Sequence, residues 1–358
     1  MNRACCRLLS IALALIAVHT NADTNIESCD SMQSIQVKGW GGPDVLTVAD
    51  SAAIPVPSGS DVCVKIFAAG VNPVETYIRA GTYGSAKSPP LPWTPGNDGA
   101  GIVERVGPDY AGPFAPGDRV YTAGSVSGTY AQYALCRAGQ LQPLPAGVSF
   151  AQGAAVGVAY RTAHRALFIR GRARSGAAVL VHGASGGVGL AAVQLAAAHG
   201  CRVTGTASTE AGRALVLANG AAAALDHSAE GYLAGHSFDV IVEMLANVNL
   251  GKDLKALNRG GVVAVVGNRG AHVGSVDFRD LMNIEGSVVG VLGGTAEEKA
   301  QGYAAVNALL ARGALSPVVG PTFTLDQAPA AHVEVIEHKA GSAGKIVLLP
   351  WGAEAAGL

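Results

Sequence analysis

Seven residues at 183–189, GASGGVG, form the stretch of this sequence best suited to binding a phosphate group. A short apolar run at 179–181 precedes them and an alanine-rich segment follows, which predicts the order strand, glycine turn, helix. Glycines let the backbone approach a pyrophosphate closely, and a helix N-terminus offers free N–H groups and a partial positive charge. The usual fingerprint has three glycines; here Ala184 takes the first place and Gly186 and Gly189 the others. We expect a dinucleotide-binding unit, and a tight turn of another doubly wound fold is the alternative.

The end of the following strand indicates which dinucleotide binds. An NAD enzyme usually has an acidic residue there, which bonds the ribose 2′-hydroxyl. This strand instead ends in Ala207, Ser208 and Thr209. Glu210 comes slightly too late, and Arg213 follows it. Small hydroxyl side chains beside an arginine can bind a 2′-phosphate, so the sequence favours NADPH over NADH. The alternative is that Arg213 is a solvated helix residue.

The composition is that of a globular chain with room for two domains. The chain has 358 residues, of which 49% are hydrophobic and 14% charged. The 25 basic residues nearly balance the 26 acidic residues, so no net charge draws the whole chain to nucleic acid or to a membrane surface. The 6 cysteines include no CxxC pair and are scattered, which argues against a zinc cluster and against a disulfide framework.

The first 22 residues are typical of a secretory signal peptide. Arginines precede an apolar run at 8–18, which is too short for a comfortable transmembrane helix, and small residues at 20–22 suit a cleavage site. A mitochondrial presequence is one alternative, because acidic residues are absent before Asp23, and a start of translation placed upstream of the true start near Met32 is another. The destination of the chain stays open, and no membrane association is expected once the leader is removed.

Two regions of different pattern must position these residues. From Met32 to about residue 153 the sequence has short strands punctuated by glycine and proline, which suits a compact, β-rich, barrel-like domain. The strands predicted there lie at 34–38, 62–68, 102–106 and 118–122.

From about residue 154 helices alternate with short strands, which predicts a parallel sheet with helices on both faces. The helices predicted there lie at 154–169, 190–200, 210–219 and 296–312, and the strands at 179–181, 201–206, 223–225, 239–244, 262–267 and 287–292. Two last strands, at 318–319 and 345–349, are expected to return to the first domain.

Five segments resemble the quinone oxidoreductases of the medium-chain dehydrogenase/reductase superfamily, and within them the zeta-crystallin group. These segments are GVNPVETYIRAGTY (70–83), LPWTPGNDGAG (91–101), GDRVYT (117–122), VLVHGASGGVG (179–189) and VEMLANVNL (242–250). The resemblance covers residues 34–349. It implies an α/β fold in which a doubly wound Rossmann sheet, at 154–312, is inserted in a GroES-like, β-rich catalytic domain built from 32–153 and 313–350.

The resemblance also implies a function, which is zinc-independent transfer of reducing equivalents from NADPH to a quinone by a homodimer or homotetramer. Reduction of enals, enones or enoyl thioesters is the alternative within enzymes. An RNA-binding protein that holds NADPH without turning it over is the alternative outside them, because zeta-crystallin-like proteins have been linked to RNA. The arginines at 161–174, which lie near His164, form a basic cluster. A solvated helix and loop would explain that cluster equally.

Positions that match the family's motifs give the candidate site residues. Asn72 and Tyr77 are the catalytic candidates, expected beside the nicotinamide. Tyr77 either donates a hydrogen bond to a developing oxyanion or packs on the ring, and Asn72 either binds the ribose or carboxamide or forms a turn before Pro73. The cofactor-binding candidates are Tyr77, Ser185, Gly186, Gly187, Val188, Ser208, His227, Asn249, Val266, Gly267, Asn268, Arg269, Val291, Leu292 and Gly293.

The related zinc alcohol dehydrogenases use a cysteine and a histidine as metal ligands, and the matching positions fall near Asn72 and Asn97. Neither asparagine is a usual zinc ligand, so we expect no metal. We expect Glu75 to be structural in a turn, Asp98 to be structural near the start of a strand, and His182 to be structural at the end of the first Rossmann strand.

Overall fold

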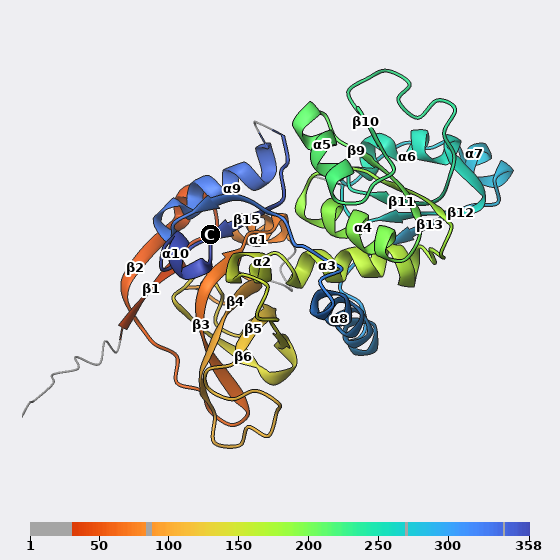
Figure 1. Ribbon diagram of the computed structural model, residues 1–358. Helices are drawn as coiled ribbons and strands as arrows, with labels where there is room; N and C mark the ends of the chain where they lie inside the picture. The colour runs from red at the N-terminus through yellow and green to blue at the C-terminus, as the bar shows by residue number, and fades with distance from the viewer. Residues whose placement is uncertain (1–30, 84–87, 269–270, 339–340) are drawn as a thin grey trace, which may run out of the picture. The chain divides into compact units, whose positions relative to one another are not determined.

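The computed structural model describes residues 31–83, 88–268, 271–338 and 341–358 (Figure 1). The predicted leader at 1–22 and the predicted cofactor residue Arg269 lie outside the described residues. No described helix combines the length and the apolar character that crossing a bilayer would require.

Strands from both ends of the chain build one seven-stranded sheet. In spatial order they are β14 (Val319–Phe323), β15 (Lys345–Leu348), β3 (Asp61–Gly70), β4 (Asp98–Val106), β5 (Arg119–Ala123) and β7 (Leu141–Pro143), with β6 (Tyr133–Arg137) paired to β3. All neighbours are antiparallel except β14 and β15. The strands β1 (Ser31–Val37) and β2 (Leu46–Ala53) form a separate antiparallel pair.

Short helices accompany these strands. They are α1 (Pro73–Arg79), α2 (Phe150–Ala154), α9 (Ala328–Glu337) and α10 (Ala353–Ala356), with 3₁₀ turns at Pro43–Val45, Ala138–Gln140 and Leu325–Gln327. Helix α9 packs against α1 and β15, so that the last part of the chain supports the helix that carries Tyr77. Alternate apolar residues of β3, such as Val62, Val64 and Ile66, are fully buried in the core below.

The second sheet is parallel throughout. Its spatial order is β10 (Ala223–Leu225), β9 (Arg202–Thr206), β8 (Ala178–Val181), β11 (Phe238–Glu243), β12 (Leu257–Val265) and β13 (Ser287–Gly290). The chain moves outward from β8 in one direction and then in the other, as in a Rossmann fold. Its helices are α3 (Gly157–His164), α4 (Gly187–Ala198), α5 (Glu210–Ala218), α6 (Ala246–Lys255), α7 (Phe278–Asn283) and α8 (Ala296–Ala311).

Both faces of the parallel sheet are covered, as the sequence pattern predicted. Val179 and Val181 of β8 belong to one apolar core, whereas Ala178 and Leu180 of the same strand belong to another. Successive side chains of a strand point to opposite faces, so a core on each side explains why the whole strand is apolar. The predicted fold class, a Rossmann sheet with a GroES-like β-rich domain, is confirmed.

Several boundaries differ from the prediction. The helix expected at 154–169 is α3, which continues as a π-helical turn at Arg165–Arg170, and the separate helix α2 ends where the expected range begins. The strand expected at 287–292 ends at Gly290, because the two glycines that follow Leu292, at 293 and 294, both take positive φ and turn the chain. Glu75, which we expected to be structural in a turn, lies in the first turn of α1.

Candidate active site

The four predicted phosphate-binding residues, 185–188, lie at the start of helix α4. Gly183 takes the left-handed conformation that lets the chain turn there, with φ of 54°. A Cβ atom on Gly189 would lie 2.2 Å from the Gly183 carbonyl oxygen, so the third glycine is needed for close packing. At Gly186 the nearest atom would be 3.5 Å away, and the first turn of α4 has no acidic residue. The turn therefore suits a pyrophosphate, because a helix N-terminus without a nearby acidic residue offers N–H groups to an anion.

Arg213 folds back onto the tip of β9. Its Nη1 donates to the carbonyl oxygens of Ser208 (3.2 Å) and Ala207 (3.3 Å), and it pairs with Asp226 at 3.0 Å. A hydrogen bond from Ser228 N–H and the nearby Arg213 lower the pKa of Asp226. The guanidinium is thus held at the strand end rather than free in solvent, beside the exposed Ser208. Asp226 was not predicted as its partner, because no local pattern marks it.

Thr206, the last residue of β9, joins two predicted cofactor segments. Its Oγ1 accepts a hydrogen bond from Gly183 N–H at 3.2 Å. The same oxygen lies 3.2 Å from Nδ1 of His227, whose side chain reaches it from the segment after β10. Thr206 is fully buried, whereas His227 is exposed. The hydroxyl was not predicted as a site residue, although it stands at the end of the strand that ends beside the ribose in this fold.

The remaining predicted cofactor residues follow the ends of β11, β12 and β13. Asn249 lies in α6 and donates from Nδ2 to Glu243 Oε1 at 3.3 Å. Residues 266–268 directly follow β12, and residues 291–293 directly follow β13. Every described cofactor candidate of the Rossmann unit therefore lies at the carboxyl edge of the sheet, where open α/β folds bind ligands. Leu292 is 67% exposed, and nothing in the described residues covers it.

Asn72 stands in a buried polar cluster, together with Glu75, Asn97, Asp98 and Lys345; we call these five residues the Asn72 cluster. As the N-cap of α1, Asn72 donates its backbone N–H to Glu75 Oε2 at 2.6 Å. Its side-chain Nδ2 donates to Glu75 Oε1 (3.2 Å) and to Asp98 Oδ2 (3.0 Å). Both N–H groups of the amide are therefore in use.

Lys345 supplies the positive charge of the Asn72 cluster. Its ammonium donates to Asn72 Oδ1 and to Asp98 Oδ2, the latter at 3.0 Å. Glu75 receives a further bond from Asn97 Nδ2 at 2.9 Å. Burial raises the pKa of Glu75 to about 7, and Lys345 opposes that shift. Lys345 also passes close to Gly187 of the phosphate turn, where a Cβ would meet its Cδ at 3.3 Å.

The Asn72 cluster is held together by hydrogen bonds and one ion pair. Asn72 and Asn97, near which we expected the metal-ligand positions of the related zinc alcohol dehydrogenases to fall, each donate an amide N–H to Glu75. An amide that donates in this way turns its hydrogens, not a lone pair, toward the carboxylate. The ammonium of Lys345 already neutralises Asp98. The donor set therefore does not fit a zinc ion.

Tyr77 lies on α1, one turn from the Asn72 cluster, with its side chain half-buried. Its carbonyl oxygen accepts bonds from the backbone N–H of Thr82 (3.0 Å) and from the Thr82 hydroxyl (3.2 Å), which closes the helix. Asn72 fixes the start of the same helix. The structure thus places both catalytic candidates on one short, doubly anchored element.

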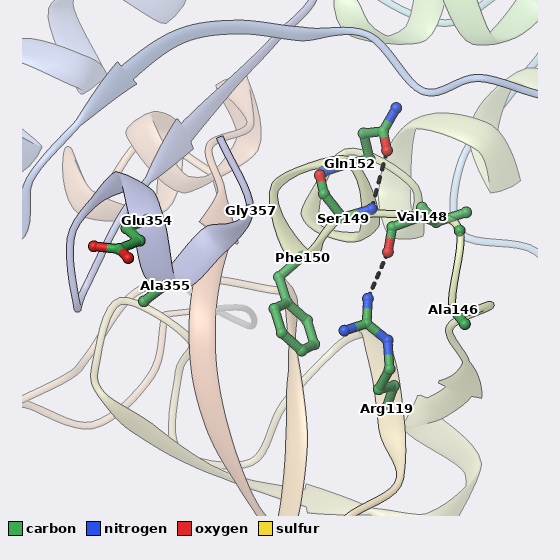
Figure 2. A pocket seen from close by; sticks show the side chains of 10 residues that line it. Arg119, Ala146, Val148, Ser149, Phe150, Gln152, Glu354, Ala355 and Gly357 are labelled. Atoms are coloured by element: carbon green, nitrogen blue, oxygen red, sulfur yellow. Dashed lines mark hydrogen bonds between the residues drawn. The ribbon is translucent and has the colours of Figure 1, made fainter.

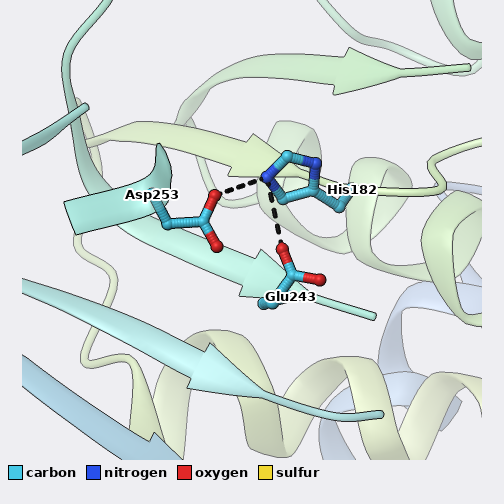
Figure 3. A group of neighbouring side chains, drawn as sticks. All are labelled: His182, Glu243 and Asp253. Atoms are coloured by element: carbon cyan, nitrogen blue, oxygen red, sulfur yellow. Dashed lines mark hydrogen bonds and ion pairs between the residues drawn. The ribbon is translucent and has the colours of Figure 1, made fainter. Parts of the chain in front are cut away.

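A second buried ionic group lies at the carboxyl edge of the parallel sheet. His182 follows β8, Glu243 ends β11 and Asp253 comes from α6; we call these residues the His182 triad (Figure 3). His182 Nε2 lies 2.8 Å from Asp253 Oδ1 and 3.3 Å from Glu243 Oε2. Burial raises the pKa of both carboxyl groups to about 7 and lowers the pKa of His182. The sequence placed His182 at the end of this strand but gave no sign of its two partners.

A surface hollow lies away from the predicted site residues. Its volume is about 440 Å³, and it is lined by residues 146–150, Gln152, Arg119, part of α10 and Gly357 (Figure 2). The guanidinium of Arg119 lies 4.0 Å from the centre of the Phe150 ring. None of the predicted site residues lines this hollow, so it does not bear on the cofactor.

Comparison with known proteins gives consistent matches. The family described as zinc-binding dehydrogenase matches residues 187–312, and the family described as alcohol dehydrogenase GroES-like domain matches residues 58–146. The chain is 46% identical to quinone oxidoreductase from Homo sapiens over 89% of this chain and 98% of the relative. It is 32% identical to quinone oxidoreductase from Pseudomonas aeruginosa over 88% of this chain and 99% of the relative.

Solved structures agree in fold. The quinone oxidoreductase of Escherichia coli complexed with NADPH superimposes with a TM-score of 0.77 at 29% identity, over 89% of this chain and all of that one. A mycobacterial protein complexed with NADPH gives a TM-score of 0.79 at 29% identity over the same share of this chain and all of its own.

Proposed function

Because this chain belongs to the quinone oxidoreductases of the medium-chain dehydrogenase/reductase superfamily, we propose that it reduces a quinone with NADPH and uses no metal ion. One observation carries the proposal. The described cofactor candidates gather at the carboxyl edge of the parallel sheet, and the phosphate turn lies next to the Asn72 cluster through Lys345. That arrangement suits a dinucleotide whose reactive ring points toward α1.

The choice of NADPH rests on the tip of β9. The Arg213 guanidinium is held there beside Ser208, where a 2′-phosphate would receive its charge-assisted bonds. Asp226 pairs with the same guanidinium and helps to hold it at the strand end. Two relatives of known structure are complexed with NADPH, which supports the same choice.

In the proposed reaction the chain's own residues mainly bind and orient. NADPH, when bound, supplies the reducing equivalents from its dihydronicotinamide ring. The start of α4 would hold the pyrophosphate, and Tyr77 would present its ring and hydroxyl to the nicotinamide and the acceptor. Asn72, whose two N–H groups are already bonded, would act by fixing α1 and thereby Tyr77.

The test is a panel of acceptors. Purified chain is mixed with NADPH and with benzoquinones, naphthoquinones, 2-alkenals or enoyl thioesters, and the loss of NADPH absorbance is followed. We expect quinones to give the highest kcat/KM. Faster turnover of enones would favour the alternative enzyme class, and NADPH binding without turnover of any acceptor would contradict an enzymatic role.

The third hypothesis, an RNA-binding protein, gains little from the arginine cluster. Arg165 pairs with Glu298 at 3.3 Å, and Arg170 donates to the Gly290 carbonyl at 3.1 Å. These side chains are engaged within the domain, whereas a phosphate-binding surface would present them to solvent. Retention of a labelled RNA that NADPH displaces, with no quinone turnover, would restore this hypothesis.

Replacing Arg213 tests the cofactor choice directly. In Arg213→Ala we expect KM for NADPH to rise about tenfold, because one charge-assisted contact is worth about 1.4 kcal/mol. KM for NADH should stay unchanged, since NADH has no 2′-phosphate. Arg202→Ala is the matched control, because this exposed arginine lies at the opposite end of β9. Equal loss for both cofactors would contradict the assignment.

A homo-oligomer is part of the proposal. Strand β13 ends the parallel sheet, so its outer edge has no partner strand among the described residues. In α7, which precedes this strand in the chain, Phe278 and Met282 are 71% and 69% exposed, and Val288 of the strand itself is 39% exposed. An open apolar edge favours pairing with a second copy. Sedimentation should give a dimer or tetramer, and Val288→Lys should shift it toward monomer; a monomeric wild type would contradict this.

A further inference from the structure

The His182 triad is a closed group with no exposed atom to bind substrate. The side chains of Glu243 and Asp253 are fully buried, and that of His182 is 3% exposed. The proton on His182 Nε2 can point between the two carboxylates, which fixes the tautomer of the ring. Glu243 Oε2 and Asp253 Oδ2 receive no N–H or O–H from any other described residue. One proton shared between the carboxyl groups, which contact each other, would satisfy both.

Three contacts lead outward from the triad to the cofactor edge. Glu243 Oε1 accepts from the backbone N–H of Leu245 and from Asn249 Nδ2 (3.3 Å). His182 Nδ1 lies 3.5 Å from the hydroxyl of Thr206. The Leu245 and Asn249 bonds shape the segment that joins β11 to α6, and the Thr206 contact leads to the phosphate turn.

The Thr206 hydroxyl extends the network to two further cofactor segments. It accepts from Gly183 N–H at 3.2 Å, and it lies 3.2 Å from His227 Nδ1. A hydroxyl has one hydrogen, so it can donate to His182 or to His227 but not to both. The tautomer that the carboxylates impose on His182 leaves its Nδ1 as an acceptor. That choice decides how the hydroxyl, and with it the start of the phosphate turn, is oriented.

From these contacts we infer that His182, Glu243 and Asp253 are positioning residues for the dinucleotide. The inference rests on the proposed function of the same site. The triad touches no cofactor itself; it holds the phosphate turn, His227 and Asn249 in one relative geometry. Three segments that are separate in sequence thereby reach the cofactor already ordered, which lowers the entropy lost on binding.

The same donor set could in principle hold a divalent cation, since one ligand atom from each residue lies within 4.8 Å of the others. The surroundings favour a proton instead. Burial raises the pKa of Asp253 and lowers that of His182; the positive charge of Lys252, which belongs to α6, opposes the first shift and adds to the second. A second cation beside that ammonium would be repelled. A single proton satisfies both carboxylate oxygens without one.

The test separates positioning from stability by pairing two changes at one residue. Asp253→Asn keeps an oxygen for His182 and supplies a permanent N–H toward Glu243, so we expect Kd and KM for NADPH to match the wild type. Asp253→Leu removes both contacts. Here we expect Kd and KM for NADPH to rise about tenfold with kcat at saturating NADPH unchanged, because the chemical step is untouched.

Two further variants serve as a second test and as a control. Thr206→Val removes the hydroxyl with little change in shape, and we expect the same rise in Kd even where Asp253→Leu folds poorly. Tyr160→Phe removes an equally buried bond of the same domain, from Tyr160 to Gln194 at 2.7 Å, and should lower Tm without changing Kd. Wild-type affinity in both Asp253→Leu and Thr206→Val would overturn the inference alone. A wild type without affinity for NADPH would overturn the proposed function as well.

Discussion

The Asn72 cluster and the His182 triad both bury two carboxyl groups completely, yet they neutralise them differently. In the Asn72 cluster, Lys345 brings an ammonium and the two asparagines bring amide donors. In the triad the imidazole of His182 lies between the two acids, and burial lowers its pKa. Burial also raises the pKa of both carboxyl groups to about 7. The first cluster therefore needs a charge from another part of the chain, whereas the second needs a proton.

This difference matches what each group has to do. The Asn72 cluster ties α1 to β4 and β15, which are far apart in sequence, and an ion pair gives such a junction a fixed geometry. In the triad, His182 follows β8 and Glu243 ends the neighbouring strand β11, while Asp253 comes from α6, so all three belong to one Rossmann unit. Removing one partner of a buried ion pair is strongly destabilising, because the other charge is left buried without compensation. A group that is held by a shared proton should tolerate the replacement of one carboxyl by a neutral amide.

The largest effect should come from removing the buried cation. In Lys345→Met, Asp98 is left without its ammonium in a fully buried place, so we expect a loss of about 3–5 kcal/mol in the free energy of unfolding. Urea denaturation of the full chain measures it. Asp98→Asn in the same background should restore part of the loss, because the orphaned charge is then gone.

The control for this prediction lies on the surface. Arg259→Met breaks the exposed pair with Glu285, which should cost less than about 1 kcal/mol. If Lys345→Met and Asp98→Asn proved additive in the double variant, the two groups would not be an ion pair and the contrast between the clusters would fail.

Much of this architecture could be predicted because it depends on short-range patterns in the sequence. The glycine turn and its flanking strand have a short-range pattern, and so have the alternating helices and strands of the second sheet. The helix α1 was not predicted, although the turn expected at Asn72 and Pro73 is where it begins. Resemblance to a family supplied the rest of the cofactor candidates.

What the sequence could not predict are partners brought together by the fold. Lys345 stands 247 residues from Asp98, with no local signal that the two meet. Asp253 looks like an ordinary polar residue of an amphipathic helix, yet it is fully buried against His182. The break of the helix at Arg165–Arg170 into a π turn has no proline or glycine to mark it.

The second prediction exchanges one carboxyl for an amide in each group and follows stability with pH. Asp253 and Glu75 both have a pKa raised to about 7, so the folded chain binds more protons than the unfolded chain between about pH 4 and 7. Stability from these groups is therefore full below that window and is lost as pH rises through 7. Each substitution should reduce the decrease in the free energy of unfolding across this pH window by on the order of 2 kcal/mol.

The two variants should differ in their baseline. Asp253→Asn places an N–H where Glu243 lacks a donor, so at low pH it should match the wild type. The Glu75 carboxylate accepts hydrogen bonds from donors only. Because the amide of Glu75→Gln turns an N–H toward one of these donors, we expect this variant to be less stable than the wild type at every pH. Thermal unfolding across the pH range measures the stability of both variants. If the two variants differed from the wild type by the same amount at low pH, the distinction between the two groups would be wrong.

The smallest expected effect is that of a chelator. The Asn72 cluster has its cation in Lys345 and presents amide hydrogens to Glu75, whereas the triad has donors of a kind that bind metals. Dialysis against a strong chelator should leave kcat and Tm unchanged, and metal analysis should find far less than one ion per chain. A fall in Tm that zinc restores in the wild type but not in Asp253→Asn would place an ion in the triad. The comparison of the two groups would then be reversed. The His182 triad would depend on an added cation, whereas the Asn72 cluster would not.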